Sequence, residues 1–407
     1  MKLLIGIDWG QDHHHVCILA ANGSQQASFE ISHTVEGFAR LDAERAKFGV
    51  AAKECLVALE TAHNLMVDYL WSHQYQVYVI APVVVKSSRG RYGASGAYTD
   101  ASSAFLLADL LRTDLARFIP WRPDGELVRQ MRAKLSLIDA LQRDITRWSN
   151  RLLAVLLRVY PHPVGLFSEL TTQIGLHFLM AYPTTQAAQG LSYQDFEAFC
   201  RQHRYPTSKL PELYAYLQLP RPEPDPAALL AYQDEIPFLA RTLLPLVQHR
   251  LQLIREVKEL FGQHPDHFIF ESLPGAGDLL APGLLVKFGD HRERLPGAAI
   301  PQALAGTCPY TKQSSKKRAV LFRKACDHDF RRIAQQFAIE SVKQSVWAAT
   351  YWQEAYARCH SKSQAYRCLA NRWLAIIWKM WQTRKPYDEA YHLKQRLLRR
   401  QPRLNKH

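Results

Sequence analysis

The sequence contains no cysteine pattern that would hold a zinc ion or form a redox pair. Its seven cysteines are scattered, none stands in a Cys-x-x-Cys pair, and none has histidines at zinc-like spacing. We therefore expect free thiols in a reducing cytoplasm. Neither a zinc-binding module nor a disulfide framework accounts for the fold.

Long hydrophobic runs are also missing. A membrane-spanning helix needs about 18 consecutive apolar residues, whereas the longest run here, near residues 77–85, is strand-sized and interrupted by Pro82. Met1 leads directly into a short apolar stretch that ends at Asp8, so no signal peptide is visible. We expect a cytoplasmic protein with no membrane partner.

Acidic residues are scarce relative to basic ones. The chain has 37 Asp and Glu against 51 Lys and Arg, which gives a formal charge of +14. This balance favours a polyanionic partner and leaves the fold open. The tail, residues 382–407, is especially basic, and it is either simply solvated or a contact to backbone phosphates.

Three acidic residues nevertheless occupy places typical of a metal site. Asp8 and Glu60 each end an apolar, strand-like segment, and Asp100 opens a helical pattern over 101–112. Carboxylates at the ends of buried strands are desolvated and need a partner. Hard oxygen ligands from separate elements suit Mg²⁺ or Mn²⁺, which often acts on phosphodiesters in pairs about 4 Å apart.

Residues 1–118 have the alternating pattern of an α/β domain. We expect strands at 3–8, 14–20, 25–31, 54–60 and 76–81, and helices near 34–48, 63–73 and 101–112. Three strands followed by helix, strand, helix, strand, helix is an order that fits an RNase H-like (RuvC-type) domain.

Residues 119–263 have the pattern of a helical coiled-coil region. Apolar residues from Leu127 to Val159 recur at alternating three- and four-residue steps, broken only by Lys134. Such a seam needs a partner helix, which we place at 227–261 despite Pro237 and Pro245. An intramolecular hairpin and a dimer interface both remain open. The proline-rich stretch 161–226 is interpreted as a small helical insertion.

The third region, residues 264–381, is predicted to be mostly helical. It contains Leu273-Pro274-Gly275-Ala276-Gly277, a turn typical of a helix-hairpin-helix element. Gly275 and Gly277 would let backbone N–H groups approach a phosphate. A plain packing corner between two helices is the alternative.

A second chemical centre lies at residues 305–318. Ser314 stands among four cations, Lys312, Lys316, Lys317 and Arg318. Cations around a hydroxyl stabilise negative charge that develops on a phosphoryl group and ease deprotonation of the hydroxyl. A solvated basic loop has the same composition.

Other residues are candidates for contacts to nucleic acid or metal. Arg89 and Arg91, in a Gly-containing loop before Asp100, are candidate nucleic-acid contacts. The histidine run 13–15 is interpreted as a solvated strand start, because Mg²⁺ prefers oxygen. Tryptophans of the last region recur at helical spacing, which favours core packing over base stacking.

Several motifs occur together in order. They are Gly6-Ile7-Asp8-Trp9, Leu59-Glu60-Thr61, Thr99-Asp100 with its helix, the Leu-Pro-Gly-Ala-Gly turn, and Gly306 to Ser314. Together they resemble a DEDD transposase of the Piv and insertion-sequence one-ten family, over residues 1–120 and 265–381. The stretch 370–378 is also similar to the last helix of that family.

The resemblance implies a transposase, that is, a site-specific recombinase of a mobile element. It implies metal ligands at Asp8, Glu60 and Asp100 in a RuvC-like domain, and a nucleophilic serine, Ser314, in a C-terminal transposase domain. It also implies double-stranded DNA at the element ends and target, a bridge RNA, and a homo-oligomer, dimer or tetramer, that forms a composite site. A nucleoid-associated, prokaryotic protein is expected.

One position departs from the family pattern. The fourth acid should lie three residues after the third, one helical turn on, but this chain has Ser103 there. A hydroxyl is a neutral, weaker ligand. Either water or Asp12 compensates, or a single metal binds well, or this copy is impaired; Asp109 lies on another helical face.

Two other classes of function remain. A Holliday-junction endonuclease would use the same acids with water as the nucleophile, so that Ser314 would be dispensable. A nucleic-acid-binding relic without catalysis is the alternative that Ser103 suggests.

Overall fold

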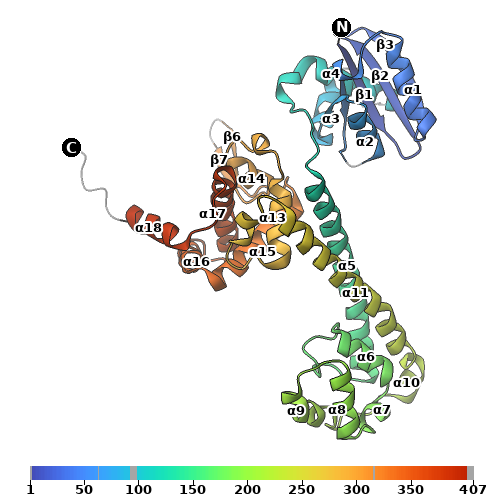
Figure 1. Ribbon diagram of the computed structural model, residues 1–407, viewed down its shortest axis with the longest axis vertical. Helices are drawn as coiled ribbons and strands as arrows, with labels where there is room; N and C mark the ends of the chain where they lie inside the picture. Colours follow the sequence, from blue (N-terminus) through green and yellow to red (C-terminus); the bar gives the residue numbers. More distant parts are fainter. Residues whose placement is uncertain (1, 63, 92–98, 315–316, 401–407) are drawn as a thin grey trace. The chain divides into compact units, whose positions relative to one another are not determined.

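The computed structural model describes residues 2–62, 64–91, 99–314 and 317–400 (Figure 1). The chain forms two compact units, Met1–Pro123 and Asp124–His407. The first unit contains a sheet and the second is mainly helical, which confirms the predicted mixed α/β class. The finer division at residues 118, 263 and 381 stays a prediction.

The first unit is built on a five-stranded sheet with the order β3-β2-β1-β4-β5. β1 pairs antiparallel with β2 and β2 antiparallel with β3, whereas β1, β4 and β5 run parallel. The strands are β1 Leu3–Trp9, β2 His13–Ala20, β3 Gln25–Ser32, β4 Cys55–Leu59 and β5 Gln76–Val79. All five predicted strands are confirmed.

Helices cover both faces of this sheet. Leu3, Ile5 and Ile7 pack with α1 and α2 on one face, and Leu4 packs with α3 and α4 on the other. The helices are α1 Val35–Ala46, α2 Leu65–Ser72, α3 Pro82–Ser88 and α4 Asp100–Asp114. Only α3 was not predicted: Pro82 interrupts the strand-like run but occupies the first turn of a helix, where proline is favoured.

The second unit begins with a long helical hairpin. α5 spans Glu126–Val159 and α11 spans Glu235–Gln263. Ion pairs Lys134–Glu256 (2.6 Å) and Arg151–Glu235 show that the helices run antiparallel. Lys134, the break in the apolar seam, therefore faces a carboxylate on the partner helix. The intramolecular hairpin is confirmed, with Pro245 inside α11.

Residues 161–234 form a helical insertion at the far end of this hairpin. Its helices are α6 Gln173–Ala181, α7 Thr185–Gln189, α8 Tyr193–Gln202, α9 Leu210–Leu217 and α10 Pro226–Tyr232. They share one core with the ends of α5 and α11, centred on Phe178 and Phe196. Helices are thus present in the stretch 161–226, whereas the partner helix predicted at 227–261 begins only at Glu235, after the separate helix α10.

The rest of the second unit is a helical core with one hairpin of strands. Its helices are α12 His267–Glu271, α13 Gly277–Phe288, α14 Ala299–Leu304, α15 His328–Gln344, α16 Val346–Cys359, α17 Lys362–Thr383 and α18 Glu389–Arg400. Trp347, Trp373 and Trp381 are at most 4% exposed, so the predicted core packing of the tryptophans is confirmed. Within the described ranges, no helix is long and apolar enough to cross a membrane.

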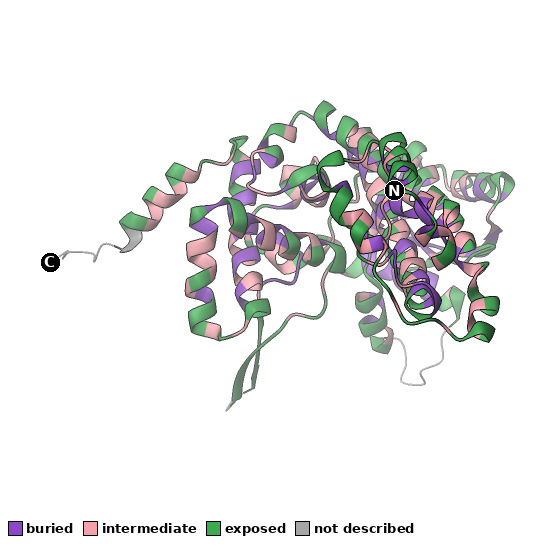
Figure 2. Cartoon of the chain, turned by 90° about the horizontal axis from the view of Figure 1, so that it is seen from below, coloured by how far each residue is buried: buried purple, intermediate pink, exposed green. Residues whose placement is uncertain are grey.

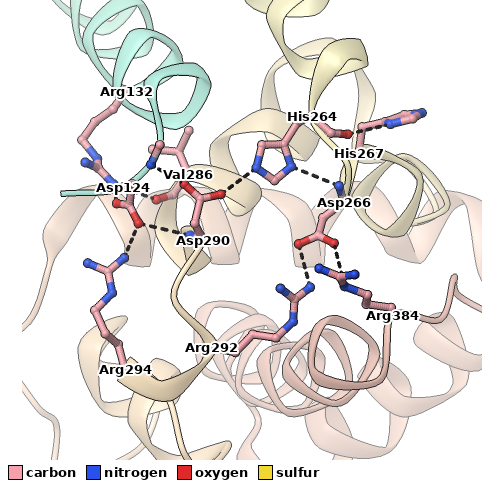
Figure 3. A network of polar contacts seen from close by, with 11 residues as sticks. Asp124, Arg132, His264, Asp266, His267, Val286, Asp290, Arg292, Arg294 and Arg384 are labelled. Carbon is pink, nitrogen blue, oxygen red and sulfur yellow. Dashed lines mark hydrogen bonds and ion pairs between the residues drawn. The ribbon is translucent and has the colours of Figure 1, made fainter. Parts of the chain in front are cut away.

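A polar network fixes both roots of the helical hairpin to this core (Figure 3). Before α5, the buried Asp124 accepts hydrogen bonds from Arg132 and Arg294. Asp290 accepts from the Gly125 backbone N–H at 2.6 Å and from His264, after α11, at 2.8 Å. The bond from His264 is the largest cause of a lowered pKa at Asp290.

Candidate active site

The carboxyl ends of β1 and β4 carry the first two predicted metal ligands. The strands are parallel, with Gly6 opposite Ala58. Two residues further along each strand, Asp8 and Glu60 reach the same edge of the sheet. Both are partly buried, so the parallel pairing brings two desolvated carboxylates together.

The third acid, Asp100, is positioned by the close contact between α4 and β1. A Cβ on Gly6 would lie 1.9 Å from the carbonyl oxygen of Ala104 and 2.6 Å from the nitrogen of Ala108. Glycine thus lets the helix backbone lie directly on the strand. Asp100 is the first residue of α4, which Thr99 caps by accepting a hydrogen bond from the Ser102 N–H at 3.2 Å.

We expect Gly6→Ala to destabilise the first unit by about 3 kcal/mol, because a methyl group must push α4 away from the sheet. Faster amide hydrogen exchange in β1 and α4 is the measurement. Gly90→Ala is the matched control, since no atom lies within 4 Å of a Cβ there. Equal protection in wild type and Gly6→Ala would contradict the close-contact argument.

The charges of the other two acids act on Asp8. The pKa of Asp8 is raised to about 6, first by burial and then by the negative charges of Asp100 and Glu60, while Arg89 opposes the rise. Asp8 therefore lies within electrostatic reach of the other two predicted carboxylates. A concentration of hard, charged oxygens fits a divalent cation such as Mg²⁺.

No three His, Cys, Asp or Glu side chains of the described residues already stand in a metal-binding arrangement. This is compatible with the electrostatic picture, because carboxylates without a cation between them repel each other.

The fourth position holds a buried hydroxyl. Ser103 is 4% exposed and lies one helical turn after Asp100. Asp12 is exposed in the turn between β1 and β2. Asp109 is buried and accepts a hydrogen bond from Arg112 at 2.7 Å, so it serves an ion pair within α4.

The two arginines before α4 differ in their surroundings. Arg91 donates to Asp114 at 2.9 Å and to Thr113 at 3.1 Å, which is a structural role. Arg89 is half-buried, and its positive charge acts to lower the pKa of Asp8. Of the pair, only Arg89 is associated with the carboxylates.

The histidine run is only partly solvated. His14 is 1% exposed and its Nε2 lies 2.8 Å from Nδ1 of His33, and burial is the first cause that lowers its pKa to about 4. His15 points to the opposite face of the sheet, where its Nε2 lies 2.8 Å from Oγ of Ser28. The expectation of a solvated strand start is therefore wrong for His14, because strand alternation turns it into the core.

Ser314 ends the first strand of an exposed hairpin. β6 Tyr310–Ser314 pairs antiparallel with β7 Lys317–Leu321, and every residue of both strands is exposed (Figure 2). The intervening positions, Ser315 and the predicted contact Lys316, lie outside the described residues. A two-stranded hairpin alone is marginally stable in water, so this one is suited to becoming ordered on a partner.

The register of the hairpin shows which of the predicted cations lie on the same face as Ser314. Ser314 is directly opposite Lys317, and Lys312 lies two residues back on the same strand, so all three share a face. Arg318 pairs with Gln313 and belongs to the other face. Lys312 and Lys317 are thus the described cations that accompany the serine hydroxyl.

The base of the hairpin contains residues that sequence reasoning missed. The guanidinium groups of Arg331 and Arg367 lie 4.5 and 4.6 Å from the ring centre of Phe322. Thr307 donates to the Asn371 side chain at 2.9 Å, which ties the segment before β6 to α17. The sequence alone gives no sign of this contact, because Thr307 and Asn371 are 64 residues apart.

The glycine turn is mainly a packing corner. Gly275 has φ +78°, and a Cβ there would lie 2.9 Å from the Glu340 carbonyl oxygen, so it faces α15. Gly277 has φ +55° and open space beside it. Asp278 follows in the first turn of α13 and pairs with Lys258 at 3.1 Å, which places negative charge where a phosphate would approach.

Comparison with known proteins places both centres inside matched segments. A family model described as "Transposase" (DEDD_Tnp_IS110) matches residues 5–161, and one described as "Transposase IS116/IS110/IS902 family" matches residues 268–353. The chain is 27% identical, over 96% of both chains, to a Streptomyces coelicolor protein assigned as the mini-circle transposase for IS117. It is 22% identical to the 44.8 kDa protein of insertion element IS116 from Streptomyces clavuligerus, over 96% of this chain and 97% of that one.

Proposed function

Because the chain belongs to the IS110 family of transposases, we propose that it excises and inserts a mobile element by cutting and rejoining double-stranded DNA through a serine nucleophile. The observation that carries the proposal is the placement of Asp8 and Glu60 at the carboxyl ends of the adjacent parallel strands β1 and β4, with Asp100 opening the helix that packs directly on β1. The raised pKa of Asp8 supports it, because perturbed carboxylates are typical of functional sites.

The first unit is proposed to be an RNase H-like (RuvC-type) metal-binding domain. The order β3-β2-β1-β4-β5, with acids at the ends of the adjacent parallel strands β1 and β4, supports this assignment. Asp8, Glu60 and Asp100, with the Ser103 hydroxyl beside them, would hold Mg²⁺ or Mn²⁺. When bound, the ion would polarise a phosphoryl oxygen and neutralise developing charge.

The proposed serine step uses the β6–β7 hairpin. The Ser314 Oγ–phosphorus bond forms while the bond from phosphorus to a sugar oxygen breaks, and the serine proton is given up as the leaving oxygen takes one. Lys312 and Lys317, on the same face, stabilise the added negative charge. The covalent phosphoserine keeps the bond energy, so reversal on another DNA end rejoins the strands.

The partners are proposed from charge and from the family. A formal charge of +14 supports binding to nucleic acid, and we propose both DNA and a bridge RNA encoded beside the gene. Because carboxylates and serine lie in different units, we propose that a homo-oligomer, a dimer or tetramer, assembles them on DNA in a composite site. Its place would be the nucleoid of a prokaryotic cell.

The direct test is excision from a plasmid that carries the element with its native flanking DNA. Purified protein with its co-purifying RNA should produce a sealed junction in Mg²⁺ and none in EDTA, scored by sequencing across the junction. A discrete RNA whose loops match the element ends is expected in the same preparation. Excision that proceeds unchanged in EDTA would overturn the metal-dependent proposal.

Ser103 motivates a second candidate, a nucleic-acid-binding relic with an impaired site. Ser103→Asp adds one negative charge a helical turn from Asp100, so we expect Mn²⁺ to bind about tenfold more tightly, as measured by electron paramagnetic resonance. Ala101→Asp, on a different face of α4, is the control and should change the affinity much less. Activity that appears only in Ser103→Asp would establish the relic.

A further inference from the structure

A groove of about 950 Å³ runs between α16, α17 and α18 in the second unit. Figure 1 shows the three helices in succession at the carboxyl-terminal end of the chain. The groove is floored by apolar side chains, among them Trp347, Ile376 and Met380, which are buried. Neither the carboxylate cluster nor the serine hairpin contributes to it.

Five Arg and Lys side chains line it, against two acidic ones, Glu354 and Asp388. Arg358, Arg372, Lys379 and Lys385 line the groove, and none of them has an ion pair among the residues that the structure describes. Arg396 also lines it and pairs with Glu354. Cations without partners beside an apolar floor favour a ligand that carries both negative charge and flat apolar surface.

Aromatic rings in the groove are suited to such a flat apolar surface. Trp347 and Tyr351 stack with their ring centres 5.7 Å apart, and the Arg396 guanidinium lies 5.9 Å from the Tyr351 centre. Tyr391 is 55% exposed and lines the groove from α18. His392 also lines the groove, and its ring is stacked on Tyr387 with the ring centres 5.0 Å apart.

We propose that this groove binds an unpaired segment of nucleic acid, with a base against the apolar floor and backbone phosphates against the four cations. Stacking platforms combined with cations are the general means of holding single strands. A duplex keeps its bases inside the stack and cannot use the floor. The inference goes beyond strand cleavage and does not depend on Ser314 or on metal.

The test uses the full chain and a fluorescein-labelled 12-nucleotide single strand, as RNA and as DNA, in EDTA. Arg358→Glu with Lys379→Glu reverses two exposed groove cations, and we expect at least fivefold weaker binding by fluorescence anisotropy, with a shallower salt dependence. Lys362→Glu with Lys394→Glu is the matched control, because it changes net charge equally on α17 and α18 outside the groove. The control should weaken binding less than twofold.

A second variant separates stacking from charge. Tyr391→Ala leaves the charge unchanged and should weaken single-strand binding about threefold or more, with duplex binding unaffected. Comparing the RNA and DNA probes identifies which strand the groove prefers. Equal weakening in the groove and control pairs, or a preference for duplex, would overturn the proposal. Plasmid excision is measured in parallel, so loss of cleavage and loss of groove binding are distinguished.

Discussion

Ser314→Ala is expected to abolish excision, with a fall in rate on the order of 10⁴-fold or more, because no other atom replaces the attacking oxygen. Wild type incubated with an element-end substrate should yield a protein–DNA adduct that survives denaturation. Mass spectrometry should place the link on the peptide that contains Ser314. The alanine variant should give no adduct while still binding the substrate.

The hairpin offers a matched control for this experiment. Thr311 also carries a hydroxyl on β6 but lies on the opposite face, so Thr311→Ala should keep adduct formation within about threefold. If Ser314→Ala still cuts DNA, the attacking group is water. The chain would then act as a junction endonuclease that uses the same carboxylates.

Asp8→Asn is expected to have opposite effects on metal binding and on stability. The variant removes a ligand charge, so Mn²⁺ binding should fall at least tenfold, and excision should be lost. At pH 7 without metal, however, hydrogen exchange in β1 and β4 should slow, because a half-buried charge beside two others has been removed. Asp12→Asn, at an exposed position, should leave both properties unchanged.

The raised pKa also predicts the pH dependence. The pKa of folded Asp8 is about 6, above the ordinary value of 3.8, so the metal-free fold gains stability as the pH falls through that interval. A divalent ion competes with that proton, so metal affinity should decline below about pH 6. Affinity that is flat between pH 7 and pH 5 would contradict the assignment of Asp8 as a ligand.

The sheet and its acids were predictable because their signals are local. β1 and β4 are apolar runs, β2 contains one, and parallel pairing of β1 with β4 carries Asp8 and Glu60 to one edge without further information. The helical hairpin was predictable from its seam for the same reason. Even Lys134, the irregularity, is explained by a single partner, Glu256.

Other features depend on contacts between distant segments and could not be derived from a pattern. No strands were predicted in the serine segment, because its polar composition hides the pairing that forms β6 and β7. Gly275 suits both a phosphate contact and a packing corner, and only the approach of Glu340 favours the latter. The groove needs three helices, the last of which begins at Glu389 in the basic tail, where no helix was predicted.

The roots of the helical hairpin have a consequence for how such proteins diversify. The chain leaves the core at Gly125 and returns at His264, and both points are held by one carboxylate, Asp290. The outer part of the hairpin, beyond Val128, Met131 and Phe261, which pack into the core, can therefore vary as a module whose two ends meet at a fixed anchor. During evolution its length can change by whole heptads and its tip by a whole small domain. The core that carries the serine is then under separate selection. An engineer can use the same junction to transplant the arm of one relative onto the core of another.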